Sequence, residues 1–300
     1  MTQRKDRVDL SGAVWLISFS LLLGFNQALV KLVNAGLAPF AQAGLRSVAA
    51  VLPVLIYALV MRKRLAITDG SLPLGILCGL FFAAEFALLF VALDFSTVTR
   101  VSLFFYTMPL WVAVAAHFLI AGEQLTARKF TGLCIALAGV ALGLFSGTTN
   151  TPAETGGTSL WVGDVLALLG ACFWAGVALL LRTTRLAQVS AEMNLLYQLA
   201  VSGIVLTTCA WLFYEPIREP TPLIWGAFAF QVIFVACIGF LGWIWLLNTY
   251  PVTDMASFSL LTPLFAIGFG WLIFDDQITW LFLLALALVL IGLALVNQRR

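Results

Sequence analysis

The sequence has very little charge. Only 10% of its 300 residues are Asp, Glu, Lys or Arg, compared with about 25% in a typical soluble domain. Hydrophobic residues make up 62% of the chain, and the mean hydropathy is +1.04. This composition excludes a soluble globular protein. The net charge of +2 is small and the basic residues are dispersed, so we expect no nucleic-acid partner.

Residues that support metal, redox or nucleophilic chemistry are also scarce. There is one histidine, and each of the five cysteines stands alone in an apolar run, without metal-ligand or redox spacing. The chain has no Gly-x-x-x-x-Gly-Lys-Ser/Thr loop for nucleotide phosphates and no Gly-x-Ser-x-Gly turn for a serine nucleophile. We therefore expect no cofactor, no metal and no enzymatic activity.

Long apolar runs, in contrast, fill almost the whole chain. A run of about 18 or more apolar residues is long enough to cross the bilayer as a helix. These runs predict an all-α integral membrane protein with ten transmembrane helices. We place the helices at 10–34, 39–61, 72–93, 97–120, 126–146, 160–182, 191–213, 223–247, 253–274 and 278–297.

The basic residues between these runs predict the orientation of the chain. Twelve Lys and Arg residues lie on the segments that share a side with the N-terminus, whereas the opposite ends carry only Arg100 and Arg218. Cytoplasmic loops of membrane proteins are enriched in Lys and Arg. We therefore expect both termini to be cytoplasmic.

The second half of the chain repeats the first at nearly constant offsets of 151 to 154 residues. The aligned positions pair Lys31 with Arg182, Val98-Thr99 with Val252-Thr253, Pro109-Leu110 with Pro263-Leu264, Glu123-Gln124-Leu125-Thr126 with Asp276-Gln277-Ile278-Thr279, and Gly139 with Gly292. Because each repeat has an odd number of spans, five, the second repeat enters the bilayer from the side opposite to the first. We therefore expect two inverted five-helix repeats, residues 1–150 and 151–300, divided by a linker from Ser146 to Ser159, with a substrate site between them near mid-membrane.

At these positions the chain resembles the drug/metabolite transporter superfamily, of the EamA type, over nearly its whole length. The resemblance rests on Pro109 and Pro263, on the acidic-x-hydrophobic-Thr turns that end at Thr126 and Thr279, and on the glycine-containing helices that follow. Within the superfamily the chain most resembles the YddG-like aromatic amino acid exporters. The resemblance implies a multi-pass protein of the bacterial inner membrane, with a small-molecule substrate and the lipid bilayer as partners, working as a monomer or a homodimer.

Polar residues inside the apolar runs are candidates for the substrate site, because ionisable groups are costly in lipid. At 1.5 Å per residue, Arg46 and Glu85 lie about 10 Å and 12 Å from the outer ends of their helices. The predicted substrate-binding set is Asn26, Gln27, Gln42, Arg46 and Glu85, with Tyr106, Trp174 and Tyr197 as aromatic walls. A guanidinium and a carboxylate suit the two charges of an amino acid.

Two other interpretations of Arg46 and Glu85 stay open at this point. The two side chains can pair with each other and hold their helices together, or Glu85 can couple transport to protons. A third possibility combines these roles, with substrate arrival breaking the pair.

The short turns and the prolines are candidates for moving parts. Asp94 and Arg100 flank an outer turn and Asp254 lies at the equivalent inner turn, where they predict either gate contacts or helix caps. Pro109 and Pro263 each remove a helical hydrogen bond, which predicts either hinges or static kinks.

We therefore expect a secondary transporter that exports amino acids, aromatic or bulky and neutral, by alternating access. The alternatives are a carrier of other metabolites or cationic drugs, a carrier of nucleotide sugars or phosphorylated metabolites, and a channel-like facilitator. A phosphate ester demands several buried cations, whereas here only Arg46 is well inside and Glu85 opposes it.

Overall fold

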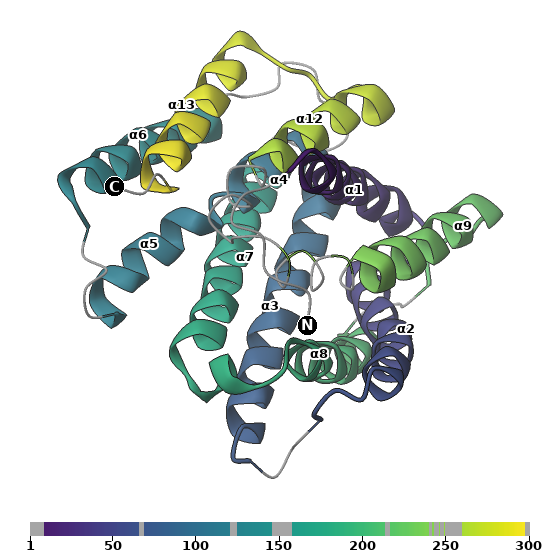
Figure 1. Ribbon diagram of the computed structural model, residues 1–300. Coiled ribbons are helices and arrows are strands. Elements are labelled where there is room, and N and C mark those ends of the chain that lie inside the picture. Colours follow the sequence, from purple (N-terminus) through teal and green to yellow (C-terminus); the bar gives the residue numbers. More distant parts are fainter. Residues whose placement is uncertain are drawn as a thin grey trace.

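The computed structural model describes residues 9–65, 69–120, 125–145, 158–213, 217–239, 242, 246, 249 and 260–297. Within these ranges the chain is helical and contains no strand (Figure 1). An isolated bridge pairs Leu37 with Ile217. Most of the predicted linker from Ser146 to Ser159, and with it the divide at residue 150, lies outside the described residues.

The helices follow the predicted apolar runs closely. They are α1 (Leu10–Asn34), α2 (Pro39–Val60), α3 (Leu72–Phe95), α4 (Val98–Phe105), α5 (Met108–Leu119), α6 (Ala127–Phe145), α7 (Thr158–Thr183), α8 (Ala191–Phe213), α9 (Pro222–Phe230), α12 (Leu261–Phe274) and α13 (Trp280–Asn297), with a 3-10 turn η1 (Arg185–Gln188) and a π-helix η2 (Gln231–Gly239). Eight segments in the described part are long and apolar enough to cross a membrane. With the two shorter apolar helices α12 and α13, they account for the ten predicted spans.

The two turns that carry the repeat motif start helices in the same way. The Thr126 hydroxyl accepts a hydrogen bond from the Lys129 backbone N–H at 3.3 Å before α6. The Thr279 hydroxyl accepts one from the Phe282 N–H at 3.2 Å before α13. A threonine in this position satisfies one of the backbone donors that a helix leaves unpaired at its start. The repeated turn is therefore a helix cap, used twice.

The predicted helix at 97–120 is confirmed as one candidate membrane span, Val98–Leu119, which is interrupted near the predicted bend at Pro109. It consists of α4 and α5, separated at Tyr106 and Thr107. Pro109 has no N–H for the carbonyl four residues earlier, and its ring clashes with that carbonyl. Pro263 instead lies in the first turn of α12, where no intrahelical donor is lost. The two prolines thus start helices in the described part.

The predicted eighth helix changes its winding part-way. It is α-helical over α9 and π-helical over η2, beginning at Gln231. A π segment widens the helix and is frequent at functional sites. The sequence of this stretch is uniformly apolar apart from Gln231 and carries no signal for the change.

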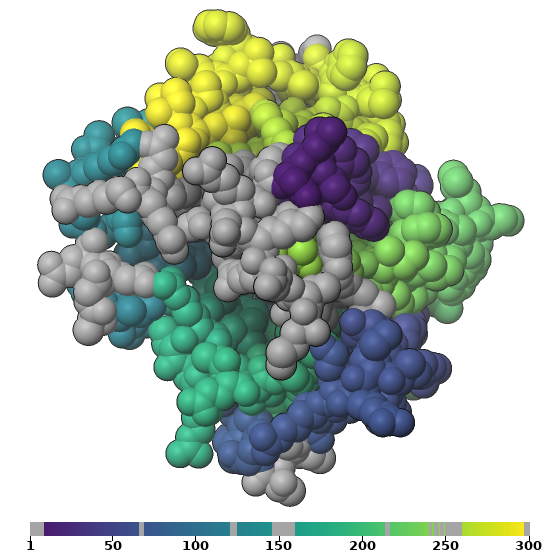
Figure 2. Space-filling view, in the orientation of Figure 1, coloured from purple at the N-terminus to yellow at the C-terminus, as the bar shows by residue number. Residues whose placement is uncertain are grey.

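The contacts between helices have the pattern expected of two equivalent repeats. In the two repeats α1 is equivalent to α7, α2 to α8, and α3 to α9 with η2. The contact of α3 with α7 therefore has its equivalent in the contact of α1 with α9 and η2, and that of α3 with α8 in the contact of α2 with η2. The contact of α1 with α12 is likewise equivalent to that of α7 with α4 and α5. The contacts of α2 with α8 and of α6 with α13 are each their own equivalent. Segments of both halves therefore interleave, as the neighbouring purple, green and yellow surfaces in Figure 2 show.

Glycines allow the closest of these helix contacts. A Cβ atom at Gly292 of α13 would lie 2.5 Å from the Gly132 carbonyl oxygen and 2.5 Å from the Ala136 Cβ of α6. A Cβ atom at Gly139 would lie 2.7 Å from the Ala285 carbonyl oxygen. Small residues at such positions let helix backbones approach in membranes. The α6–α13 pair at one edge of the molecule (Figure 1) depends on them.

Candidate substrate site and outer latch

Arg46 lies deep in the helix bundle and faces aromatic rings. Its side chain projects from α2 and the residue is only 4% exposed. The guanidinium carbon is 4.4 Å from the centroid of the Phe86 ring and 4.9 Å from that of the Phe90 ring, both on α3. A cation over aromatic faces is stabilised more strongly when it is removed from water. The two rings are therefore the direct contacts of the Arg46 guanidinium.

Glu85 precedes these rings on α3 and is equally buried, at 4% exposure. In the described part of the chain no direct ion pair joins it to Arg46, although the two groups interact electrostatically over a longer distance. Its Oε2 atom is buried and has no hydrogen-bond partner among the described residues. A buried unpaired carboxylate oxygen is costly, which makes it a candidate for contact with a ligand.

Gln42 connects this region to the second repeat. It lies one turn from Arg46 on α2, and its Nε2 donates to Oε1 of Gln231 in η2 at 3.1 Å. Both residues have no exposed surface. The remaining atoms of the two amides, Oε1 of Gln42 and Nε2 of Gln231, have no partner in the described part. Gln231 was not among the predicted site residues, although a lone polar residue in an apolar run was a visible signal.

Asn26 and Gln27 are adjacent on α1 and are both buried. Each keeps a side-chain oxygen without a hydrogen-bond partner in the described part. The Gln27 amide interacts with the Tyr106 hydroxyl at the break between α4 and α5. All five polar residues of the predicted set are buried, and Gln27 contacts Tyr106, one of the predicted aromatic walls.

Three aromatic residues meet at that break. The Trp174 ring of α7 stacks on Phe105 with centroids 5.0 Å apart, and it meets Tyr106 edge-on at 6.0 Å. A Cβ atom at Gly170 would lie 3.4 Å from the Phe105 ring and 3.5 Å from the Glu85 carbonyl oxygen. The aromatic cluster therefore lies beside the Glu85 turn of α3.

Tyr197 lies apart from the other predicted site residues. Its hydroxyl is 2.9 Å from the Ser71 hydroxyl at the start of α3, and its ring lies where a Cβ atom of Gly75 would be. Ser71 is about 21 Å from Glu85 along the helix, at 1.5 Å per residue. Tyr197 instead packs the start of α3 against the N-terminal part of α8.

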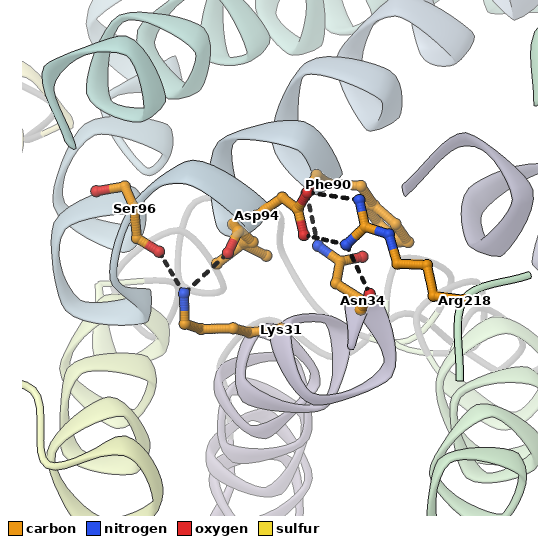
Figure 3. Close-up of polar contacts among 7 residues, drawn as sticks. Lys31, Asn34, Phe90, Asp94, Ser96 and Arg218 are labelled. Carbon is orange, nitrogen blue, oxygen red and sulfur yellow. Dashed lines mark hydrogen bonds and ion pairs between the residues drawn. The ribbon is translucent and has the colours of Figure 1, made fainter. Parts of the chain in front are cut away.

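An ion pair joins the two repeats at the end of the molecule that the charge distribution predicts to face outward. Arg218, which precedes α9, donates from Nη1 and Nη2 to the two Asp94 carboxylate oxygens on α3, each at 2.8 Å. Its Nη1 also donates to the Asn34 carbonyl oxygen at 2.9 Å, and the Asn34 amide donates to the Phe90 carbonyl oxygen at 2.8 Å (Figure 3). We call Asn34, Asp94 and Arg218 the outer latch.

Lys31 fastens the same end of α3. Its ammonium donates to the carbonyl oxygens of Leu93 at 3.0 Å and Ser96 at 2.6 Å (Figure 3). These are among the carbonyls that a helix leaves unpaired at its C-terminus, where the helix dipole favours a cation. Lys31 therefore caps α3, and α1 and α3 are held together next to the latch.

Arg100, predicted as a gate contact or helix cap, forms a buried ion pair with Asp164 of α7, whose carboxylate also accepts a hydrogen bond from the Ser96 hydroxyl at 3.2 Å. Arg100 is 4% exposed and Asp164 is fully buried. Sequence reasoning missed Asp164, although an acidic residue inside an apolar helix was itself the signal. Asp254, the predicted inner counterpart, lies outside the described residues.

The comparisons with known proteins agree with this architecture. A sequence model described as the EamA-like transporter family matches residues 10–145 and 161–298, which is most of the chain in two successive copies. The chain belongs to the EamA-like transporter family. It is a multi-pass membrane transporter of the drug/metabolite superfamily, with a small-molecule substrate and the lipid bilayer as partners.

Relatives in this family cover nearly the same length. The uncharacterized transporter YoaV of Bacillus subtilis is 24% identical over 93% of this chain and 94% of its own length. The uncharacterized transporter sll0355 of Synechocystis is 24% identical over 99% of this chain and 93% of its own. A solved crystal structure matches 94% of this chain with a TM-score of 0.66 at 20% identity, which shows the fold.

Proposed function

We propose that this EamA-like transporter exports amino acids with aromatic or bulky neutral side chains from the bacterial cytoplasm by alternating access. The observation that carries the proposal is the separation of two buried opposite charges. The Arg46 guanidinium faces rings rather than a carboxylate, and Glu85 keeps an unpaired oxygen on the neighbouring helix. An α-carboxylate and an α-ammonium are complementary to these groups.

Each side chain in the site then has a defined task. Arg46 leaves its ring contacts and binds the substrate carboxylate with two parallel N–H···O bonds. Glu85 accepts from the ammonium, and the free amide atoms of Gln42 and Gln231 complete the hydrogen bonds from both repeats. Tyr106 and Trp174 provide apolar surface for a large side chain, as ligand sites commonly do.

Helix α3 gives a route from the site to the latch. Phe90 faces Arg46 with its ring and binds Asn34 through its carbonyl oxygen, and Asp94 lies one turn further on. When Arg46 turns from Phe90 to a substrate, this turn of α3 loses a contact that is present only in the empty site. Bound substrate thereby favours the conformation in which the latch is open, because it binds that conformation more tightly than the one with the latch closed.

The charge balance favours a zwitterion over a phosphate ester. Arg46 and Glu85 are one cation and one anion, so a dianion gains little from the pair. The unpaired oxygens of Asn26, Gln27, Gln42 and Glu85 are acceptors and call for a ligand that brings N–H donors. A cationic amine without a carboxylate is therefore the second candidate.

Two features of the organisation belong to the same proposal. Residues 1–150 and 151–300 act as two inverted repeats that move relative to each other around the site, which the twofold match of the family model supports. Both termini lie in the cytoplasm, which the distribution of basic residues supports.

Transport into proteoliposomes tests the proposal. Purified protein is reconstituted, and uptake of labelled phenylalanine and tryptophan is measured with and without a pH gradient. We expect saturable uptake that unlabelled bulky amino acids inhibit, and a dependence on the gradient indicates proton coupling. Uptake no greater than in empty liposomes, while a cationic dye crosses in the same preparation, would overturn the amino acid assignment and leave the family unchanged.

A further inference from the structure

A polar cavity lies at the opposite end of the molecule from the outer latch. It has a volume of about 180 Å³ and is lined mainly by Arg64, Asp69 and Ser71 of the α2–α3 loop and by Arg185, Gln188 and Ser190 of the α7–α8 connection. A water molecule occupies about 30 Å³ of liquid, so the cavity accommodates a group several times larger. The two connections come from different repeats, and the cavity therefore lies on the seam between them.

The cavity is built from fixed contacts. The Ser190 hydroxyl donates to the Arg64 carbonyl oxygen at 2.9 Å across the seam. Nearby, Lys63 and Glu192 form an ion pair at 2.8 Å that also joins the two repeats. This pair raises the pKa of Lys63, so Lys63 stays charged at neutral pH. The walls of the cavity are thus held in place by hydrogen bonds and an ion pair that do not use the arginine side chains.

Gly70 allows Arg185 to lie against the α2–α3 loop. It adopts a φ of +79°, which favours glycine, and a Cβ atom there would lie 3.0 Å from Nη1 of Arg185. The guanidinium of Arg185 therefore lies directly on the backbone of the α2–α3 turn. A side chain at position 70 would therefore crowd the Arg185 guanidinium.

The charges facing the cavity do not cancel. Two arginines, Arg64 and Arg185, and one aspartate, Asp69, line the cavity, and all three residues are exposed. Hydrogen bonds from Ser71 lower the pKa of Asp69, so it is ionised, and its Oδ1 accepts from the Ser71 N–H at 3.0 Å. In the described part of the chain neither arginine forms an ion pair. Like charges that share a small cavity repel, and an anion between them removes that repulsion.

The surroundings indicate a lipid. The helix ends that flank the cavity expose apolar side chains, with Val60 69%, Met61 54% and Leu72 41% exposed. These are positions for acyl chains beside a headgroup. Basic pockets between transmembrane helices on the cytoplasmic side bind anionic headgroups, and guanidiniums bind phosphate with paired N–H···O bonds.

We propose that this cavity binds the phosphate of an anionic phospholipid from the cytoplasmic leaflet, with Arg64 and Arg185 as its ligands from the two repeats. The lipid bridges the repeats at their inner seam. The cytoplasmic placement rests on the orientation proposed above, whereas binding itself depends only on the cavity. Asp69 opposes the phosphate and limits the affinity.

Native mass spectrometry of the purified protein with added lipid tests this site. The ligands are phosphatidylglycerol, phosphatidylcholine and inorganic phosphate. The test variant is Arg64→Gln with Arg185→Gln, and the matched control is Arg128→Gln with Lys129→Gln, which removes the same charge at the start of α6. We expect wild type and control to retain phosphatidylglycerol, and the test variant to bind it about tenfold more weakly.

The variant Asp69→Asn provides a second test, in which binding is expected to become tighter instead of weaker. It removes the opposing charge and is expected to tighten phosphatidylglycerol binding several-fold. Equal weakening in test and control variants would show general surface charge and overturn the site. Binding of inorganic phosphate that displaces the lipid at equal concentration would overturn the lipid assignment. Because no transport is measured, these outcomes are independent of the amino acid proposal.

Discussion

Phe90 lies against Arg46 with its ring centroid 4.9 Å from the guanidinium carbon, and its carbonyl oxygen accepts a hydrogen bond from Asn34 at 2.8 Å. One residue of α3 therefore contacts both the buried arginine and the outer latch. This relationship gives a physical connection between occupancy of the site and closure of the outer end. Energetic coupling of this kind requires an element with two arrangements, whose balance both sites influence. Helix α3 contacts both the buried arginine and the latch and can be that element.

The outer latch is expected to open more often when its ion pair is removed. Half-exposed ion pairs contribute about 0.2–1 kcal/mol, so Asp94→Asn should raise the open population up to about fivefold. A cysteine at Leu37, which is buried and bridged to Ile217, reports the opening by its labelling rate with a membrane-impermeant maleimide in a chain without its native cysteines.

A charge swap controls this test. Asp94→Arg combined with Arg218→Asp restores the pair with its polarity reversed, and its labelling rate should return towards that of the parent. An unchanged rate in Asp94→Asn would mean that the pair does not hold the outer end closed.

The Arg100–Asp164 pair is expected to matter for stability. Removing one partner of a buried ion pair costs about 3–5 kcal/mol, because the other charge stays buried without compensation. Asp164→Leu should therefore lower the unfolding temperature strongly in detergent. Arg100→Met with Asp164→Leu removes both charges and should recover most of the loss. If the double variant is as unstable as the single one, the fold depends on the contact between Arg100 and Asp164, and the loss is not caused by an uncompensated buried charge.

Gly292 is expected to be intolerant of any side chain. Gly292→Ala places a Cβ atom 2.5 Å from Gly132 O and Ala136 Cβ, which forces α6 and α13 apart, and overpacking of this kind costs about 1–3 kcal/mol. Gly268→Ala on α12 is the control, since nothing lies within 4 Å of its Cβ position. Thermal unfolding should separate the two variants, and equal melting temperatures would contradict close packing at Gly292.

Gln231 is expected to contribute to substrate affinity from the second repeat. Gln231→Leu removes a buried amide that has one unpaired donor. We expect KM for phenylalanine to rise about tenfold with little change in maximal rate, since about 1.4 kcal/mol corresponds to one such factor. Gln277→Leu, at an exposed glutamine, should leave KM unchanged. A lower maximal rate with the same KM would assign Gln231 to the conformational change instead.

The helices were largely predictable because the signal for a membrane span is local. Apolar runs and capping threonines such as Thr126 and Thr279 lie next to the ends they define. The interruption at Tyr106–Thr107 was less accessible, since Pro109 is compatible with either a bend or a break. The π-helix that begins at Gln231 had no local signal in the sequence.

The polar contacts show the opposite balance. Arg46 and Glu85 are both buried, but depth along a helix does not give the direction of a side chain around it. For that reason the contact of Tyr197 with Ser71, away from Arg46 and Glu85, could not be predicted. The partner of Arg100 lies 64 residues away on α7, and such a long-range pair cannot be inferred from spacing.

Equilibrium binding of two ligands to wild type and to Arg46→Ala tests the central claim most directly. Phenylalanine carries a carboxylate and an ammonium, whereas phenethylamine lacks only the carboxylate. If Arg46 binds the carboxylate, Arg46→Ala should weaken phenylalanine binding at least tenfold, as expected for a charge-assisted hydrogen bond of about 1.5–3 kcal/mol. Phenethylamine binding should change less than threefold. Equal weakening of both ligands, or an unchanged affinity for phenylalanine, would contradict the role of Arg46.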